Sequence, residues 1–261
     1  MRAKGSRGLW LGSLALLALG VLLLLNNFLL LSGFNVGALW PLLLVIVGVL
    51  VLLRGDFMPG ADARTFGITR GSVESATLEI SAGEIDVVAR ALQREGRLIA
   101  GQFALDSRPQ LSVQDTHAYL RMDRAATPWL SFANWEMALS RDLPWGIYVS
   151  TSLGQIDLDL RGLIIQKAVL ATGLGDIQLT CPQEAFEPLV VRSAVGSIRI
   201  LTPPGNHVRI YASGSRRFNV YADENRYTQP EPGVYVSRDS AANAPAVEIY
   251  VSGTLGDAYF A

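Results

Sequence analysis

The chain has 261 residues, half of them hydrophobic, with 22 Lys and Arg against 23 Asp and Glu. The four charged residues up to Arg54 are all basic, so the rest of the chain carries a net negative charge. An acidic remainder without a basic stripe excludes nucleic acid as an expected partner. The single cysteine, Cys181, excludes an internal disulfide and a cysteine-rich metal site.

Two apolar runs stand at the start of the chain. The first, 9–25, has no charge and is long enough, at about 1.5 Å per residue, to cross a hydrocarbon core of about 30 Å. The second, 38–53, is at the short end of that range and stops at Arg54. These runs predict a transmembrane α-helical hairpin over 1–54. The alternative for the first run is a cleaved signal peptide, but no small-x-small cleavage site follows it.

Charge predicts the orientation of this hairpin. The segment between the two runs is uncharged, whereas both outer flanks are basic. By the positive-inside rule, both termini and everything after Arg54 are expected in the cytoplasm. Asn26 and Asn27 interrupt the apolar sequence and can be interpreted as a polar site in the membrane or as the start of the turn. Their place near the outer end of the first span favours the turn.

The sequence changes character after the hairpin. Residues 55–70 contain glycine, proline and mixed charge, which predicts a linker. From 71 to 261, apolar and polar residues alternate with a period of two, which predicts an all-β domain. In "GQIDLDL", residues 154–160, three aliphatic residues face one side and two aspartates the other.

A short motif recurs in this domain. Gly154, Gly175 and Gly196 lie 21 residues apart, each in a Gly-x-Ile-x-[Leu/Ile] unit. A glycine at a corner between two strands permits positive φ or close backbone approach, so the period predicts one coil of a β-solenoid-like stack. A leucine-rich repeat of similar length would need a Leu-x-x-Leu-x-Leu framework, which is absent. The repeat turns are expected at Gly83, Gly154, Gly175, Gly196 and Gly256, with a degenerate unit from Ser213.

Two parts of the chain resemble a known bacterial family. Residues 8–55, with "LWPLLL" at 39–44, resemble the transmembrane hairpin of LiaI/LiaF-like envelope proteins. The units "SVESATLEISAGEIDV", "GLGDIQL" and "VSGTLGD" resemble the toast-rack domain that follows such hairpins. The resemblance implies a membrane-anchored accessory protein of the cell-envelope stress response. Its implied partners are the lipid bilayer and a membrane sensor kinase or another envelope protein.

No pattern in the sequence points to catalysis. His117 and His207 are the only histidines and lack ligand spacing, and the usual nucleophile, phosphate and dinucleotide motifs are missing. We therefore expect no enzyme activity, catalytic residue, cofactor or metal. Acidic residues near the glycines can be interpreted as calcium ligands or as part of a solvated face. The residues after the glycines, Gln155, Asp176 and Ser197, form no acidic ladder, which favours the solvated face.

Three of the five tryptophans lie between 129 and 145. Trp135, Met137 and Leu139 alternate on one strand face and are expected in the core. Trp129 follows a proline in an expected loop and is the candidate partner contact.

The leading functional hypothesis is a non-enzymatic, membrane-anchored regulator or scaffold that binds a membrane partner through its β domain. The alternative is an exported adhesin-like or envelope structural protein. A third hypothesis, a repeat-type carbohydrate enzyme, requires paired carboxylates in a cleft.

Overall fold

A computed structural model describes residues 64–93, 96–103, 109–123, 134–238 and 245–261. All of them belong to the second of the two units of the chain, Gly55–Ala261. Within these described ranges no helix is long and apolar enough to cross a membrane. The predicted hairpin over 1–54 lies outside the described residues and stays a prediction.

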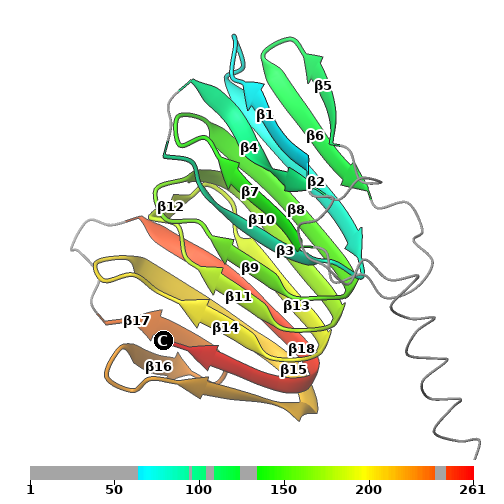
Figure 1. Cartoon of the computed structure of the whole chain (residues 1–261). Coiled ribbons are helices and arrows are strands. Elements are labelled where there is room, and N and C mark those ends of the chain that lie inside the picture. Colours follow the sequence, from blue (N-terminus) through cyan, green and yellow to red (C-terminus); the bar gives the residue numbers. More distant parts are fainter. Residues whose placement is uncertain (1–63, 94–95, 104–108, 124–133, 239–244) are drawn as a thin grey trace, which may run out of the picture. The chain divides into compact units, whose positions relative to one another are not determined.

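Two layers of parallel strands enclose the core of this unit (Figure 1). In spatial order, the first layer contains β6 (His117–Asp123), β2 (Ser75–Gly83), β8 (Pro144–Leu153), β10 (Ile164–Leu174), β13 (Leu189–Val195), and the first halves of β18 (Ala246–Phe260) and β15 (His207–Ala222). The second layer contains, in the same order, β7 (Asn134–Leu139), β3 (Asp86–Ala91), β9 (Ile156–Asp159), β11 (Ile177–Thr180), β14 (Ile198–Leu201), and the second halves of β18 and β15. The all-β fold expected from the alternating sequence is confirmed.

Shorter or antiparallel strands flank the two layers. They are β1 (Arg64–Thr69) on β4 (Arg97–Phe103), β4 on β7, β5 (Gln110–Gln114) on β6, β17 (Val234–Ser237) on β15, β16 (Tyr227–Glu231) on β17, and the parallel two-residue β12 (Glu184–Ala185) on β10. Strand β1 falls within the segment 55–70 that the sequence predicted as a linker. It forms there because Phe66 and Ile68 alternate with polar residues and pack against the core.

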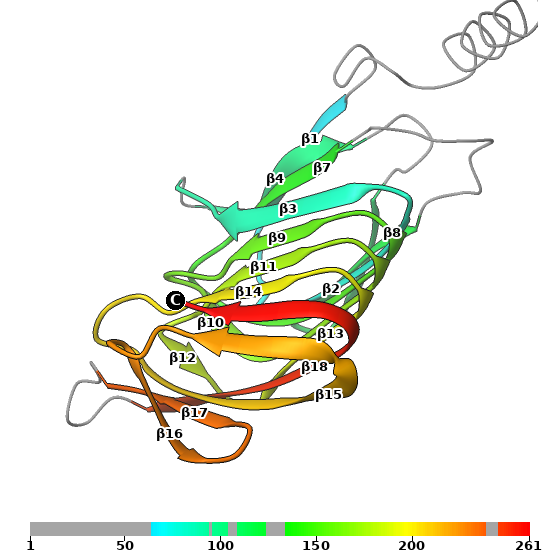
Figure 2. The ribbon, with the colours of Figure 1, turned by 90° about the horizontal axis from the view of Figure 1, so that it is seen from below.

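The spatial order differs from the chain order at both ends of the stack. β6 and β7 follow β2 and β3 in the sequence but lie outside them. At the other end, β18 is the last strand of the chain, yet it lies between β13–β14 and β15 (Figure 2). The stack therefore cannot be built by adding one rung after another along the chain.

The core follows the two-residue period of the strands. Ile156, Leu158 and Leu160 are buried, whereas the aspartates between them point outward. Every rung contributes aliphatic residues in the same way, so the core is one continuous cluster. The predicted core group of Trp135, Met137 and Leu139 is confirmed, with 1% exposure or less for each side chain.

Candidate binding surface

The corners between the two layers are built on a column of glycines. Gly154, Gly175 and Gly196 lie at the bends between β8 and β9, β10 and β11, and β13 and β14, and Gly256 lies at the corresponding place within β18. Each amide of the first three donates to a carbonyl group of the next rung. A Cβ on Gly175 would lie 2.0 Å from the carbonyl oxygen of Gly154, and the spacing repeats along the column. No side chain fits at this spacing, so backbone approach explains the period of 21 residues.

Gly83 occupies a different position from the other predicted repeat glycines. It pairs with Thr151, and Ile85 approaches Gly154 in its place. Gly83 has a φ of 61°, and a Cβ built on it would contact nothing within 4 Å. It therefore serves the local turn between β2 and β3 rather than the stacked column.

Buried hydroxyl groups line the inside of the corners. Thr151, Thr172 and Ser193 each lie three residues before a corner glycine and are at most 6% exposed. Thr151 Oγ1 donates to Thr172 Oγ1 at 3.0 Å, and Thr172 Oγ1 donates to the carbonyl oxygen of Gly154 at 3.3 Å. The second bond satisfies a carbonyl group that the sharp corner would otherwise leave without a partner. These buried hydroxyl groups were not predicted from the sequence, although they occur there as a [Ser/Thr]-x-x-Gly pattern.

The residues that follow the corners form a second column on the outer surface. In spatial order it contains Asp86, Gln155, Asp176, Ser197, Asp257 and Asn219. Asp176 Oδ1 accepts a hydrogen bond from the amide of Ser197 at 2.6 Å, and Asp86 Oδ1 accepts one from the amide of Gln155 at 2.7 Å. Acids alternate with neutral residues, so no two carboxylates are adjacent in this column.

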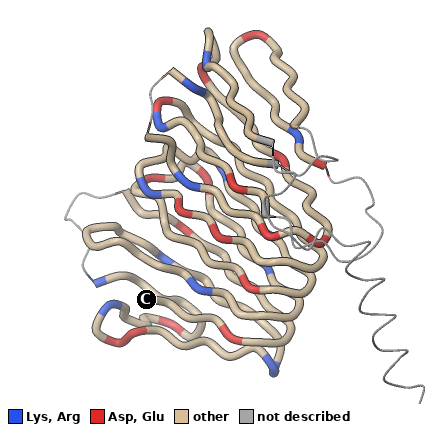
Figure 3. The backbone as a smooth tube through the Cα atoms, viewed as in Figure 1, with Lys and Arg blue, Asp and Glu red and all other residues tan. Residues whose placement is uncertain are grey.

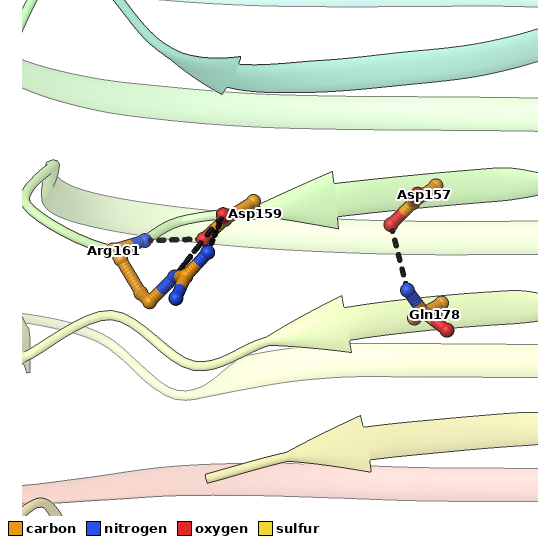
Figure 4. Close-up of polar contacts among 4 residues, drawn as sticks. All are labelled: Asp157, Asp159, Arg161 and Gln178. Atoms are coloured by element: carbon orange, nitrogen blue, oxygen red, sulfur yellow. Dashed lines mark hydrogen bonds and ion pairs between the residues drawn. The ribbon is translucent and has the colours of Figure 1, made fainter. Parts of the chain in front are cut away.

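Two further aspartates lie on β9 (Figure 4). Asp159 accepts a hydrogen bond from Arg161 Nε at 2.8 Å, and this bond lowers the pKa of the Asp159 carboxyl. Asp157 accepts a bond from Gln178 Nε2 at 3.3 Å. Asp157, Gln178 and Arg199 line a shallow groove of about 200 Å³ together with the corner residues. Each of the two aspartates is thus engaged by a neighbouring side chain.

The remaining reactive side chains hold the fold together. His117 bridges β6 to β2, with Nδ1 2.6 Å from Ser75 Oγ and Nε2 2.9 Å from Thr77 Oγ1. Cys181 is fully buried, and burial raises the pKa of its thiol to about 12, so the nucleophilic thiolate is strongly disfavoured. Among the described residues, no group of three or more His, Cys, Asp or Glu residues is arranged to hold a metal ion.

An exposed aliphatic row runs along the corner edge. It consists of the residues immediately before the column of glycines, Leu153, Leu174, Val195 and Leu255, which are paired in register and 40%, 48%, 37% and 41% exposed. We call these four residues the corner row. Asp176 and Asp257 lie two residues after Leu174 and Leu255, on the second-layer side. Asp86 lies beside Gln155, which follows Leu153 by two residues. The corner row is the candidate binding surface.

The rest of the described surface has no block of one charge (Figure 3). Acidic and basic residues are interspersed along the strands, and the ion pairs, such as Lys167 with Glu187, are exposed. Trp129, the partner contact suggested by the sequence, lies outside the described residues.

Comparison with known proteins places this domain. Residues 65–201 match the family described as Toast_rack_N, the N-terminal domain of toast_rack, DUF2154. The chain belongs to this family. The match covers the toast-rack rungs from β1 to β14 and so contains three of the four corner-row residues. No curated protein matches the chain.

A solved structure shares the fold of this domain. A candidate cell adhesion protein from Clostridium sporogenes is 15% identical, covers 76% of this chain and 97% of its own, and superimposes with a TM-score of 0.67. Candidate adhesins from Bacteroides fragilis and Parabacteroides merdae are 11% and 10% identical. They cover 78% of this chain and 99% and 98% of their own, with TM-scores of 0.33 and 0.22. Of these three, the Clostridium protein alone shows a shared fold.

Proposed function

We propose that this protein is a non-enzymatic scaffold that is anchored in the bacterial membrane and binds a membrane partner through its toast-rack domain. The observation that carries the proposal is the corner row, four aliphatic side chains held in register on a rigid edge. A contiguous row of exposed aliphatic side chains is typical of an interaction site. The hairpin resemblance supports the membrane anchor and a role in envelope stress signalling.

The geometry of the corner row favours an amphipathic helix as its ligand. Neighbouring strands are about 4.8 Å apart, and one helical turn rises about 5.4 Å, so a helix along the row places one apolar side chain near each strand. Asp86, Asp176 and Asp257 beside the row favour basic residues next to the apolar stripe. A basic amphipathic segment of a membrane protein, such as a sensor kinase, combines both properties.

Site-specific photocrosslinking in native membranes tests this proposal. A photoreactive amino acid at Leu174 is expected to capture a membrane protein, and Leu153→Ser with Leu255→Ser should weaken the capture. Val113 on β5 is 50% exposed and far along the stack from the corner row, so it is the matched control position. Equal capture at both positions, or none at Leu174, would exclude the corner row as the binding surface.

The cytoplasmic location is a separate part of the proposal, and its support is the basic flanks of the apolar runs. The second candidate function is an exported adhesin-like protein, which the fold shared with the Clostridium sporogenes candidate adhesion protein favours. Alkaline phosphatase fused after Ala261 separates the two. The regulator proposal expects an inactive fusion, and an active one would favour the adhesin.

A further inference from the structure

The stack ends in an open strand edge. The second half of β15, Arg217–Ala222, pairs with β18 on one side. Among the described residues, no strand pairs with its other side, because β17 pairs only with Arg209–Tyr211 in the first half (Figure 2). An edge of this kind presents unpaired N–H and C=O groups and can be extended by another strand.

The side chains of this edge resemble those of an interior strand. Phe218 is 8% exposed, and Val220 and Ala222 are half-buried against the end of the core. Asn219 and Tyr221 point outward, and the Tyr221 ring stacks on Tyr259 with 5.4 Å between ring centroids. The edge has no proline and no inward-facing charge, whereas the outer strand β16 contains a proline. The devices that normally protect a free edge are therefore missing within the strand itself.

Charges of opposite sign stand at the two ends of the edge. Arg217 is its first residue and Arg216 precedes it, and Asp223 and Glu224 follow its last residue. Within the described residues, none of the four forms an ion pair. An identical strand that approaches in the antiparallel direction would bring each pair of charges opposite its complement.

We propose that two copies of this chain associate through residues 216–224, with the two β15 edges paired antiparallel around a two-fold axis at Val220. The inward-facing residues of one strand must lie opposite the inward-facing residues of the other, so the allowed registers differ from one another by two residues. Only one of these registers pairs Phe218 with Ala222 and brings the turn that contains Asp223 and Glu224 close to Arg216 and Arg217 of the second copy. In that register Asn219 lies opposite Tyr221 of the second copy, and the second layer becomes one continuous sheet across the dimer. This association goes beyond the proposed function and does not depend on the corner row.

Disulfide trapping in the membrane tests the register. The full chain is produced as two differently tagged variants, Asn219→Cys and Tyr221→Cys. Opposite residues in an antiparallel pair, here Asn219 and Tyr221 of the second copy, have Cβ atoms about 5 Å apart, close to disulfide geometry. In this register residue 219 of one copy and residue 219 of the other are diagonal neighbours and are farther apart, and the same holds for residue 221. The mixture of the two variants is expected to form disulfide-linked dimers several-fold faster than either variant alone. The wild-type chain, whose one cysteine is the buried Cys181, gives the background level of disulfide-linked dimers.

Charge reversal provides the second measurement, by light scattering of the full chain in mild detergent. The single variants Arg216→Glu and Glu224→Arg are each expected to weaken dimerisation about tenfold, because each dimer contains the pair twice. The double variant is expected to restore it. Both side chains are exposed, so circular dichroism should show an unchanged fold. A monomeric wild-type chain, disulfides without preference for the mixture, or a double variant as weak as the singles would each overturn the proposal.

Discussion

Replacement of Gly175 by alanine tests the close backbone packing of the corners. Gly175 has a φ of 147°, which L side chains rarely adopt, and the new Cβ would lie 2.0 Å from the carbonyl oxygen of Gly154. The backbone strain costs about 1–3 kcal/mol and the steric overlap adds about 1–3 kcal/mol. The free energy of unfolding is therefore expected to fall by about 2–6 kcal/mol.

The matched control is Gly71→Ala. Gly71 also has a positive φ, 58°, but a Cβ there would contact nothing within 4 Å, so only a strain of about 1–2 kcal/mol is expected. Thermal unfolding of the full chain in mild detergent, followed by circular dichroism, should show a Tm lowered by about 5–20 °C for Gly175→Ala. For Gly71→Ala the decrease should be about 2–8 °C. Equal losses for the two variants would refute the argument that the corner excludes a side chain.

Three further predictions concern the interior and the outer face. Thr172→Val should lower the free energy of unfolding by about 1–2 kcal/mol in urea titrations because it removes the hydroxyl that donates to Gly154, whereas Thr172→Ser should retain most of the stability. The pKa of Asp159 is lowered by Arg161, so its contribution is present above the ordinary value of 3.8 and is lost as the pH falls through the lowered pKa. The stability difference between wild type and Asp159→Asn should accordingly vanish in acid, and a difference that persists there would contradict this assignment. Cys181 should resist alkylation at pH 8 in the folded chain and react after unfolding, since burial raises the pKa of its thiol to about 12.

Much of the fold follows from local patterns in the sequence. The two-residue alternation predicted the strands, and the Gly-x-Ile-x-[Leu/Ile] units predicted stacked rungs, because both depend on residues close together in the chain. The corner hydroxyls were missed because Thr151, Thr172 and Ser193 read as polar residues at a strand end. Their burial becomes clear only when the chain is known to bend there from one layer into the other.

The order of the last rungs required the structure. The unit around Ser213 was expected as a degenerate rung, but its place outside β18 was not evident. β15 crosses its corner with a register shift between Gly214 and Arg217, so it cannot continue the glycine column, whereas Gly256 can. Phe218 instead fills the space left by Gly214 and Gly253. Such contacts join segments far apart in the chain, so local sequence patterns carry little information about them. The corner row likewise depends on pairings between separate strands, such as Val195 with Leu255.

The position of β18 between β14 and β15 has a consequence for synthesis on the ribosome. The residues of β15, β16 and β17 are translated first, but the site beside β13 and β14 must remain free until the final strand emerges. Closure of this end therefore involves contacts of long sequence separation, which are slow to form. A nascent chain that stops before β18 would expose two sheet edges at once, and protease sensitivity should persist until the last strand is inserted.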